Sequence, residues 1–326
     1  MPKVLITPAA LNHVDLPFVR LLRDAGWELI YPRKTPMLTE DELLQLLPGM
    51  AATIAGMEPY TRRVLASAPE LRVIARAGVG YDAVDLPAAT EQGIAVTITP
   101  GTNQDAVAEH TFALMLALAK NLVAQHNGTV AGKWPRQPNL PLRGRTLGIA
   151  GLGRIGKSVA VRGVAFGMNV IAYEPYPDRQ FVEQYRVQLM PLEQLLAESD
   201  FLTLHVPLSV ESKHLINKRT LALMKPSSFL INTARGGLVC EADLVEALNH
   251  KQIAGAGLDV FEVEPCHENP LFQLDNVVIT PHAAGVDTQS LSDMAMSSAQ
   301  SILALSRGDW PTDQVVNQEV RQKFVW

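Results

Sequence analysis

The chain has 326 residues, of which 47% are hydrophobic and 19% charged, a length that favours two domains and a composition typical of a globular protein with a large core. Its formal net charge of −5 at pH 7 argues against a general nucleic-acid-binding protein, which would carry a basic surplus. The longest apolar stretch, residues 111–119, falls well short of the roughly 20 residues that a membrane-spanning helix needs, so we expect no membrane segment.

Residues 1–100 alternate short apolar runs with amphipathic stretches, a pattern typical of βαβ units and a parallel sheet. The predicted strands cover residues 3–7, 27–31, 52–56, 71–77 and 94–99. The predicted helices between them lie near residues 15–25, 39–46, 61–67 and 86–92. Pro100 and Gly101 interrupt the alternation. A long helix predicted from about residue 104 to 124 follows, and because it is apolar almost all round, we expect it to be buried.

A glycine motif, Gly151-Leu-Gly-Arg-Ile-Gly156, directly follows a predicted strand at 146–150 and opens a predicted helix. Gly151 allows the tight turn, Gly153 lets a pyrophosphate approach the backbone, and Gly156 lets the helix pack closely on the strands. The helix N-terminus adds unpaired N–H groups and a partial positive charge. A glycine-rich turn without a ligand is the alternative, but the order of strand, glycines and helix favours a dinucleotide site.

Glu174 lies at the tip of the next predicted strand, residues 169–173. At this place a carboxylate accepts hydrogen bonds from the adenosine ribose diol and would repel a 2′-phosphate. The predicted cofactor is therefore NAD, although the nearby Arg179 leaves NADP as the alternative.

Further strands are predicted over residues 201–206, 228–233, 254–261 and 276–280, which gives a second sheet of about six strands. A last helix near residues 288–306 is expected to return to the first domain. The predicted fold class is α/β, with two doubly wound parallel-sheet domains. A Rossmann cofactor domain, residues 101–285, is inserted in a flavodoxin-like substrate domain, residues 1–100 and 286–326, and the cleft between them would hold a small substrate.

Three polar residues follow predicted strands of the second domain, at the ends where ligands of open α/β sheets bind. Arg235 would bind a substrate carboxylate and polarise the carbonyl of a 2-oxo acid through charge-assisted hydrogen bonds. His282 would donate a proton to the forming alkoxide, or remove it in the reverse direction. Glu264 would hold the imidazole and favour its protonated form. Position alone does not exclude two rivals, His205 at another strand end and Glu262.

Several further stretches extend the pattern along nearly the whole chain: Asn232-Thr-Ala-Arg-Gly-Gly237, Glu264-Pro265, Pro281-His-Ala-Ala-Gly285, Arg76-Ala-Gly-Val-Gly-Tyr-Asp82, Ala108-Glu-His-Thr-Phe-Ala-Leu-Met115 and Gly132-Lys-Trp134. Together with the glycine motif, they resemble the D-isomer-specific 2-hydroxyacid dehydrogenases, which include D-3-phosphoglycerate dehydrogenases and glyoxylate/hydroxypyruvate reductases. The resemblance implies an NAD-dependent oxidoreductase that interconverts a small anionic 2-oxo acid and its (R)-2-hydroxy acid. It makes Arg235, Glu264 and His282 the catalytic residues, and it selects Glu264 over Glu262 because the matching glutamate precedes proline.

The resemblance also implies contacts with the cofactor and the substrate. The implied cofactor contacts are Gly151, Gly153, Arg154, Ile155, Gly156, Glu174, Val206, Pro207, Thr233, Ala234, Asp259, His282 and Gly285. The implied substrate contacts are Arg76, Gly78, Val79, Gly80 and Arg235. Asp259 should face the nicotinamide carboxamide, and the turn at 78–80 should present backbone N–H groups to the substrate carboxylate. Family members are commonly dimers joined through the cofactor domain, so we expect a homodimer with the apolar helix after Asn103 at its interface.

These motifs leave the side chain of the substrate open. Some phosphoglycerate enzymes place an arginine on the loop after the third strand, where this chain has Glu58, so a phosphorylated substrate is not favoured over hydroxypyruvate, glyoxylate or a sulfonated analogue. Two other functions remain as alternatives. One is an NAD(H)-sensing binding protein like the corepressors of the same family, and the other is a formate- or phosphite-type dehydrogenase on the same fold. Formate enzymes typically carry glutamine in place of the glutamate at position 264.

The two cysteines, Cys240 and Cys266, lack metal-ligand spacing, so we predict reduced thiols and no metal site. Met1 leads almost directly into the first predicted strand, without the basic start and apolar leader of a targeting segment. These features predict a cytoplasmic protein.

Overall fold

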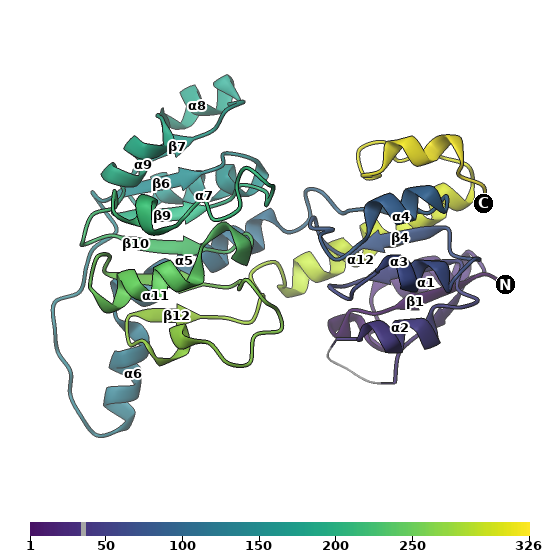
Figure 1. The fold of residues 1–326 in the computed structure, drawn as a ribbon, viewed down its shortest axis with the longest axis horizontal. Coiled ribbons are helices and arrows are strands. Elements are labelled where there is room, and N and C mark those ends of the chain that lie inside the picture. Colours follow the sequence, from purple (N-terminus) through teal and green to yellow (C-terminus); the bar gives the residue numbers. More distant parts are fainter. Residues whose placement is uncertain (34–36) are drawn as a thin grey trace. The chain divides into compact units, whose positions relative to one another are not determined.

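The computed structural model describes residues 1–33 and 37–326, which fold into two compact units (Figure 1). Unit 1 consists of Met1–Asn103 and Val286–Trp326, and unit 2 consists of Gln104–Gly285. Each unit contains one parallel sheet among its described residues, with helices on both faces. The predicted α/β fold class with two parallel-sheet domains is therefore confirmed, whereas the division of substrate and cofactor roles between the units stays a prediction.

The sheet of unit 1 has the strand order β2-β1-β3-β4-β5, and every pairing in it is parallel. Its strands are β1 (Lys3–Ile6), β2 (Glu28–Ile30), β3 (Ala52–Ala55), β4 (Val73–Arg76) and β5 (Ala95–Thr97). The apolar residues of β1, β3, β4 and β5 are buried on both faces, as a doubly covered parallel sheet requires, whereas the edge strand β2 is half-buried. The order is that of flavodoxin-like folds, so this part of the predicted fold class is confirmed.

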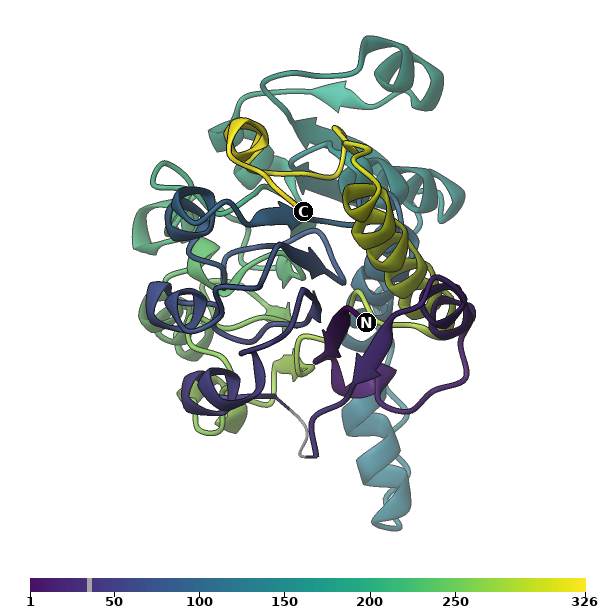
Figure 2. The ribbon, with the colours of Figure 1, turned by 90° about the vertical axis from the view of Figure 1, so that its right-hand side faces the viewer.

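Helices cover both faces of this sheet (Figure 2). They are α1 (Pro17–Asp24), α2 (Glu40–Leu46), α3 (Arg62–Ala66), α4 (Leu86–Glu91) and α12 (Thr288–Ser306), with short 3-10 helices η1 (Ala9–Leu11) and η4 (Gln318–Gln322). The pair α1 and α12 packs on one face, and α2, α3 and α4 pack on the other. The helix predicted near residues 288–306 is confirmed, and it packs against α1 and β4.

The segment after α12 runs along the edge of the same sheet, and it is yellow in Figure 2. Val315 forms an antiparallel bridge with Thr97 of β5. The side chain of Asn317 is fully buried, accepts the backbone N–H of Val96 at 2.9 Å and donates to the carbonyl of Ile94 at 2.9 Å. A side-chain amide therefore pairs with the backbone at the edge strand in the way that a further strand would.

The sheet of unit 2 has the order β12-β11-β10-β9-β6-β7-β8, again with parallel pairings. Its strands are β6 (Thr146–Ala150), β7 (Asn169–Tyr173), β8 (Gln188–Leu189), β9 (Phe201–Leu204), β10 (Phe229–Asn232), β11 (Gly255–Leu258) and β12 (Val277–Ile279). The chain adds strands outward from β6 first in one direction and then in the other, as in Rossmann folds. The two-residue strand β8 is missing from the predicted sheet because it is too short to show an apolar pattern.

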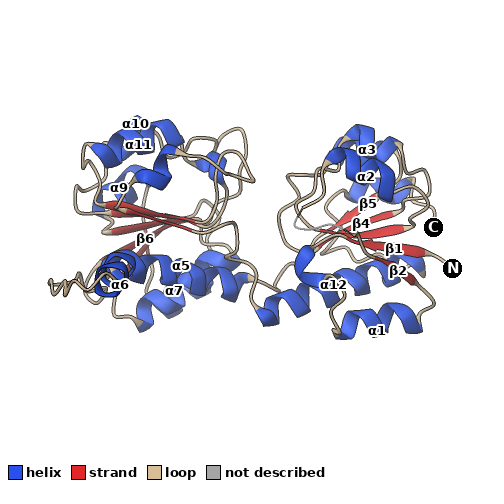
Figure 3. Ribbon diagram, turned by 90° about the horizontal axis from the view of Figure 1, so that it is seen from below, coloured by secondary structure: helices blue, strands red, loops and turns tan. Residues whose placement is uncertain are grey.

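The helices of unit 2 lie on both faces of its sheet (Figure 3). They are α5 (Gln104–Ala119), α6 (Leu122–Val130), α7 (Arg154–Ala165), α8 (Arg179–Tyr185), α9 (Leu192–Glu198), α10 (Lys218–Leu221) and α11 (Glu241–Asn249), with 3-10 helices η2 (Gly236–Leu238) and η3 (Pro270–Gln273). On one face lie α5 and α7, and on the other lie α9, α10 and α11.

The single long helix predicted over residues 104–124 is wrong, because α5 ends at Ala119 and α6 begins at Leu122. Between them, Asn121 adopts a left-handed conformation with φ of 49°, which asparagine tolerates better than most residues. The apolar helix α5 is largely buried, as predicted, whereas α6 has no buried residue. Over the described ranges, no single helix is long and apolar enough to cross a bilayer, although α5 and α6 together, bent by 59°, meet that test of length and composition.

Candidate functional site

The carboxyl ends of the parallel strands meet at one edge of the unit 2 sheet, and this edge collects the residues predicted to bind the cofactor. They are Gly151, Gly153, Arg154, Ile155 and Gly156 after β6, Glu174 after β7, Val206 and Pro207 after β9, Thr233 and Ala234 after β10, Asp259 after β11, and His282 and Gly285 after β12. Arg235 and Glu264 lie beyond the ends of β10 and β11. The edge includes the place between β6 and β9 where the strand order reverses, which is where open α/β sheets bind ligands.

The three motif glycines in the turn after β6 differ in the space around them. A Cβ atom on Gly151, whose φ is +95°, would lie 2.7 Å from the carbonyl oxygen of His205. A Cβ on Gly156 would overlap the carbonyl of Gly151. Around a Cβ on Gly153, by contrast, no atom of the described residues lies within 4 Å. Packing therefore requires the first and third glycines, and the second leaves open space at the N-terminus of α7, where a pyrophosphate fits.

The carboxylate of Glu174 is fixed beside this turn. Its Oε2 accepts the backbone N–H of Leu152 at 2.8 Å, and its Oε1 accepts the N–H of Tyr176 at 3.0 Å. Each carboxylate oxygen has a second lone pair that can accept from a ribose hydroxyl. A negative charge held at this position would repel a 2′-phosphate.

Arg235 stands on a turn that the side chain of Asn232 builds. Asn232, which is only 1% exposed, accepts the N–H of Ala234 at 3.1 Å and donates to the carbonyl of Arg235 at 2.8 Å. A Cβ on Gly236 would overlap the carbonyl of Phe261, so the turn can approach the segment after β11 only with glycine at this position. The structure thus assigns a role to Asn232, which we had not predicted as a site residue although it begins the Asn-Thr-Ala-Arg stretch.

Glu264 and His282 form a close pair. Oε2 of Glu264 lies 2.6 Å from Nδ1 of His282, and Oε1 of Glu264 accepts the backbone N–H of Phe261 at 2.9 Å. The two side chains are 19% and 30% exposed. A carboxylate partner places a proton on Nδ1, and no residue in the described part of the chain hydrogen-bonds Nε2. The pair therefore fixes the orientation of the imidazole ring and leaves Nε2 without a partner among the described residues.

Asp259 holds the backbone on which His282 stands. It is fully buried, and its carboxylate accepts the N–H groups of Ala283 and Ala284, both at 2.8 Å, and the hydroxyl of Thr280 at 2.5 Å. The backbone carbonyl of Asp259 accepts the N–H of His282 at 2.7 Å. These bonds hold His282 in a left-handed conformation, φ 53°, which is unfavourable for histidine and fixes where the imidazole points.

His205, the rival histidine, is in a different environment. Its Nε2 lies 2.9 Å from the hydroxyl of Thr203, and its Nδ1 is buried without a hydrogen-bond partner among the described residues. Burial lowers the pKa of His205 to about 3, so its imidazole is neutral at neutral pH. Glu262, the rival carboxylate, lies 2.8 Å from Nε2 of His214 instead of pairing with His282. Neither rival therefore reproduces the pair of Glu264 and His282.

In unit 1, the predicted substrate residues form one loop system after β4. Arg76 donates from Nε to the carbonyl of Gly80 at 2.6 Å, from Nη1 to the carbonyl of Ala55 at 2.9 Å, and also to the carbonyl of Gly56. Gly78 has φ of +150°, and its N–H donates to Thr99 Oγ1 at 3.0 Å. The guanidinium of Arg76 thus holds the loop in place by donating to its backbone carbonyls and to those after β3.

The remaining N–H groups of this loop, those of Val79 and Gly80, hydrogen-bond no residue within the described ranges. Glu58 is 2% exposed, and its Oε2 accepts the hydroxyl of Thr7 at 2.7 Å and the N–H of Gly56 at 2.8 Å. Glu58, at the position where some phosphoglycerate enzymes have an arginine, is therefore a buried carboxylate that organises the loop after β3.

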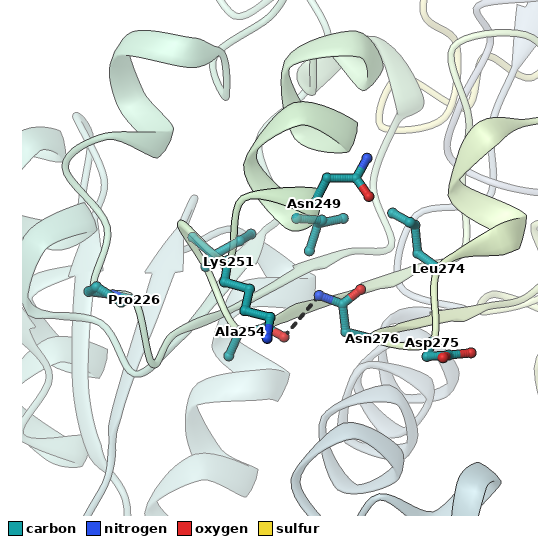
Figure 4. A pocket seen from close by; sticks show the side chains of 9 residues that line it. Pro226, Asn249, Lys251, Ala254, Leu274, Asp275 and Asn276 are labelled. Carbon is teal, nitrogen blue, oxygen red and sulfur yellow. Dashed lines mark hydrogen bonds between the residues drawn. The ribbon is translucent and has the colours of Figure 1, made fainter.

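Figure 4 shows the residues that line a surface hollow on unit 2. It is lined by Pro226, Leu248, Asn249, Lys251, Ile253, Ala254, Leu274, Asp275 and Asn276. Several of these residues directly precede β11 or β12, and Asn276 donates to the carbonyl of Ala254 at 3.2 Å. The hollow thus lies at the amino ends of the strands, and none of the predicted site residues lines it.

Residues 112–284 match a family model described as D-isomer specific 2-hydroxyacid dehydrogenase, NAD binding domain. A glyoxylate reductase of Korarchaeum cryptofilum is 43% identical over 270 residues, which cover 81% of each chain. A D-3-phosphoglycerate dehydrogenase of Methanocaldococcus jannaschii is 41% identical over 321 residues, which cover 97% of this chain and 60% of that protein. A crystal structure of D-lactate dehydrogenase from Aquifex aeolicus, complexed with NAD and lactic acid, matches with a TM-score of 0.83 and 30% identity over 97% of this chain and 99% of that one.

The buried, neutral imidazole of His205 predicts a pH effect on stability. Because its pKa is about 3 in the folded protein and 6.5 is the usual value, only the unfolded chain binds the proton between these values, and the free energy of unfolding falls as the pH falls. Replacing His205 by Gln should reduce this slope between about pH 6 and pH 5 by about 1 kcal/mol per pH unit, measured by urea unfolding. Replacement of the exposed His250 by Gln is the control, and an unchanged slope in the His205 variant would contradict the assignment.

Proposed function

The chain belongs to the D-isomer-specific 2-hydroxyacid dehydrogenase family and is an NAD-dependent dehydrogenase, and we propose that it interconverts a small anionic 2-oxo acid and its (R)-2-hydroxy acid with His282 as the general acid and base. The observation that carries this proposal is the 2.6 Å pair of Glu264 and His282, which leaves Nε2 of the imidazole without a partner among the described residues. In the direction of reduction, the 2-oxo acid, NADH and one proton yield the 2-hydroxy acid and NAD⁺.

The residues present fit the cofactor. The open space at Gly153 and the first N–H groups of α7, at Arg154 and Ile155, would hold the pyrophosphate, and Glu174 would hold the adenosine ribose. When bound, NADH supplies the hydride. The other proposed cofactor contacts lie after the neighbouring strands: Val206, Pro207, Thr233, Ala234, Asp259 and Gly285. The carboxylate of Asp259 already accepts three hydrogen bonds, so in this proposal its main task is to hold the His282 turn while it faces the carboxamide.

His282 and Glu264 perform the proton transfer in this mechanism. With Nδ1 directed to Glu264, a protonated imidazole would donate its Nε2 proton to the carbonyl oxygen of the substrate, which becomes the hydroxyl oxygen of the product. The imidazole is left neutral, with its Nδ1 proton still shared with the carboxylate, and takes up a proton from water for the next turnover. In the reverse direction, the neutral Nε2 accepts the hydroxyl proton. Glu264, whose Oε2 lies 2.6 Å from Nδ1, would keep the imidazole in this orientation in both directions.

Arg235 and the loop after β4 would bind the substrate. The guanidinium of Arg235 donates to the carbonyl of Ala234 at 2.6 Å through one nitrogen, and its planar fork suits a carboxylate and an adjacent carbonyl oxygen. The N–H groups of Val79 and Gly80 are proposed to donate to the substrate carboxylate, since no described residue accepts from them. The N–H of Gly78 is already used by Thr99, and Arg76 supports the loop from within.

The substrate is proposed to be a small 2-oxo acid without a phosphate group, such as glyoxylate or hydroxypyruvate. Glu58 places a buried negative charge on the loop after β3, and the donors of Arg76 at Nε and Nη1 are bonded to backbone carbonyls. Neither residue offers the cationic surface that a phosphate requires. The similarity to a glyoxylate reductase agrees with this proposal.

The apolar helix after Asn103, where we expected the dimer interface, is α5 and is largely buried within unit 2, so we further propose that the chain forms a homodimer through the adjoining helix α6. The apolar side chains of Leu122, Val123 and Val130 are 59%, 50% and 76% exposed, an unusual number for one short helix of a monomer. Replacing Val130 by Asp should convert a dimer into a monomer in light scattering, because a buried, unpaired charge opposes association. The matched control is Val210→Asp, since Val210 is also highly exposed, at 91%, but lies in the loop after β9 and not in α6. A monomeric wild-type protein, or dissociation of the control, would contradict the interface.

Replacing His282 by Asn tests the proposed acid and base. Asparagine tolerates the left-handed backbone at this position but does not titrate, so kcat should fall by roughly 10²- to 10⁴-fold while NADH binding changes little. His267→Asn is the control, because His267 is an exposed histidine of the loop that carries Glu264. Near-normal turnover by the His282 variant would refute the mechanism.

The substrate and the cofactor preference are tested by NADH consumption with a panel of 2-oxo acids, repeated with NADPH. The panel contains glyoxylate, hydroxypyruvate, 3-phosphohydroxypyruvate, sulfopyruvate, pyruvate and a bulky branched 2-oxo acid. We expect turnover of glyoxylate or hydroxypyruvate, with NADH preferred. Glu174→Ala should reduce that preference by roughly tenfold, equivalent to about 1.4 kcal/mol, whereas Glu183→Ala on the exposed side of α8 should not. NADH binding without turnover of any acid would instead favour the NAD(H)-sensing alternative.

A further inference from the structure

We propose that His214, Cys240 and Glu262 form a binding site for a divalent transition metal ion of the zinc type. The candidate ligand atoms of these three side chains all lie within 4.8 Å of one another. A tetrahedral zinc ion, with bonds of about 2.0–2.3 Å, separates its ligand atoms by roughly 3.3–3.6 Å, a spacing that small side-chain rotations would reach from the present arrangement.

The backbone around these residues holds the three segments together without a metal. The N–H of His214 donates to the carbonyl of Gly237 at 2.8 Å, and the N–H of Cys240 donates to the carbonyl of Ile216 at 2.8 Å. Glu262 is attached to the same region through its N–H, which donates to Oε1 of Glu241 at 2.6 Å. Because paired backbones fix where the side chains emerge, most of the ordering that metal binding requires has already occurred in the fold.

His214 is held in an unfavourable backbone conformation at this place. Its φ is 52°, in the left-handed region that histidine seldom occupies, and its carbonyl accepts the side-chain N–H of Asn217 at 2.8 Å. The imidazole presented in this way lies 2.8 Å from the carboxylate of Glu262. Residues with strained backbone conformations are common at functional sites, and here the strain places an imidazole next to a carboxylate and a thiol.

The donor set selects the kind of ion. A thiolate and an imidazole favour zinc and its neighbours among the transition metals over magnesium and calcium, which prefer oxygen ligands. Two further carboxylates, Glu241 and Asp243, lie in the first turn of α11 next to Cys240 and add negative charge that attracts a cation. Three protein ligands leave one position of a tetrahedral ion for water.

An ion at this place would cross-link segments that carry the proposed catalytic residues. Glu262 lies two positions before Glu264, and Cys240 follows the η2 turn that begins after Arg235. His214 belongs to the loop after β9. The ion would therefore reduce the freedom of the loops that position Arg235 and Glu264, while the metal itself stays outside the hydride and proton transfer.

Titration of the metal-free, full-length protein with Co²⁺ tests the site without measuring turnover. We expect a thiolate-to-cobalt charge-transfer absorption that saturates at one equivalent. Cys240→Ser should abolish this band, and the matched control Cys266→Ser should keep it, because Cys266 contacts Asn269 and Glu268 and lies outside the cluster. His214→Asn, which tolerates the left-handed backbone, should weaken binding at least tenfold, and His250→Asn should not.

Zn²⁺ provides a second readout, since a ligand that binds only the folded state raises the unfolding temperature. The rise should occur in the wild type and in Cys266→Ser, and it should be lost in Cys240→Ser and in Glu262→Gln. The Glu262 variant keeps the test valid if the cysteine variant folds poorly. No saturable cobalt band in the wild type, a band that persists in Cys240→Ser, or a band lost in Cys266→Ser would overturn the proposal.

Discussion

The buried carboxylate of Asp259 is the interaction on which the candidate active site depends. A carboxylate removed from water is strongly unfavourable unless hydrogen bonds replace its hydration, and Asp259 obtains them from Thr280, Ala283 and Ala284. These donors can all reach it only if the chain turns sharply after β12. That turn places His282 in the left-handed region and aims its imidazole at Glu264. The position of the His282 imidazole thus follows from the hydrogen bonds that one buried carboxylate requires.

The second constraint is the close approach of backbone segments to one another. Glycine permits this approach in the turn after β6 and in the turn that carries Arg235. Gly151 has no room for a Cβ atom beside His205, so the turn after β6 can lie directly against the segment after β9. Gly156 in turn lets the first turn of α7 approach the carbonyl of Gly151. Gly236 does the same between the Arg235 turn and the segment after β11. Because β6, β9, β10 and β11 are neighbours in a parallel sheet, the loops that follow them lie side by side along one edge of that sheet. Gly153 differs because the space around it is open.

Much of this arrangement is predictable from the sequence, since apolar runs indicate the strands and glycine residues indicate the turns between them. The α/β class, the sheet strands other than β8 and the placement of Arg235, Glu264 and His282 at strand ends all follow from local patterns. The break at Asn121 does not, because a single left-handed residue leaves the apolar pattern unchanged. The contrast between His205 and His282 also needs the structure, since burial and a carboxylate partner depend on residues distant in sequence.

The segment from Glu262 to Glu264 shows why chain spacing alone is a poor guide to metal and acid–base sites. The two glutamates are separated by one residue, yet Glu264 pairs with His282 and Glu262 pairs with His214, from loops far apart in the chain. Cys240 has no metal-binding residue at the usual sequence spacing, because the side chains near it, His214 and Glu262, belong to the loops after β9 and β11. One short segment therefore connects the histidine that would transfer the proton with the cluster that would bind the ion. Because only one residue separates the two glutamates, a restraint on Glu262 would also restrict the segment that carries Glu264, the partner of His282.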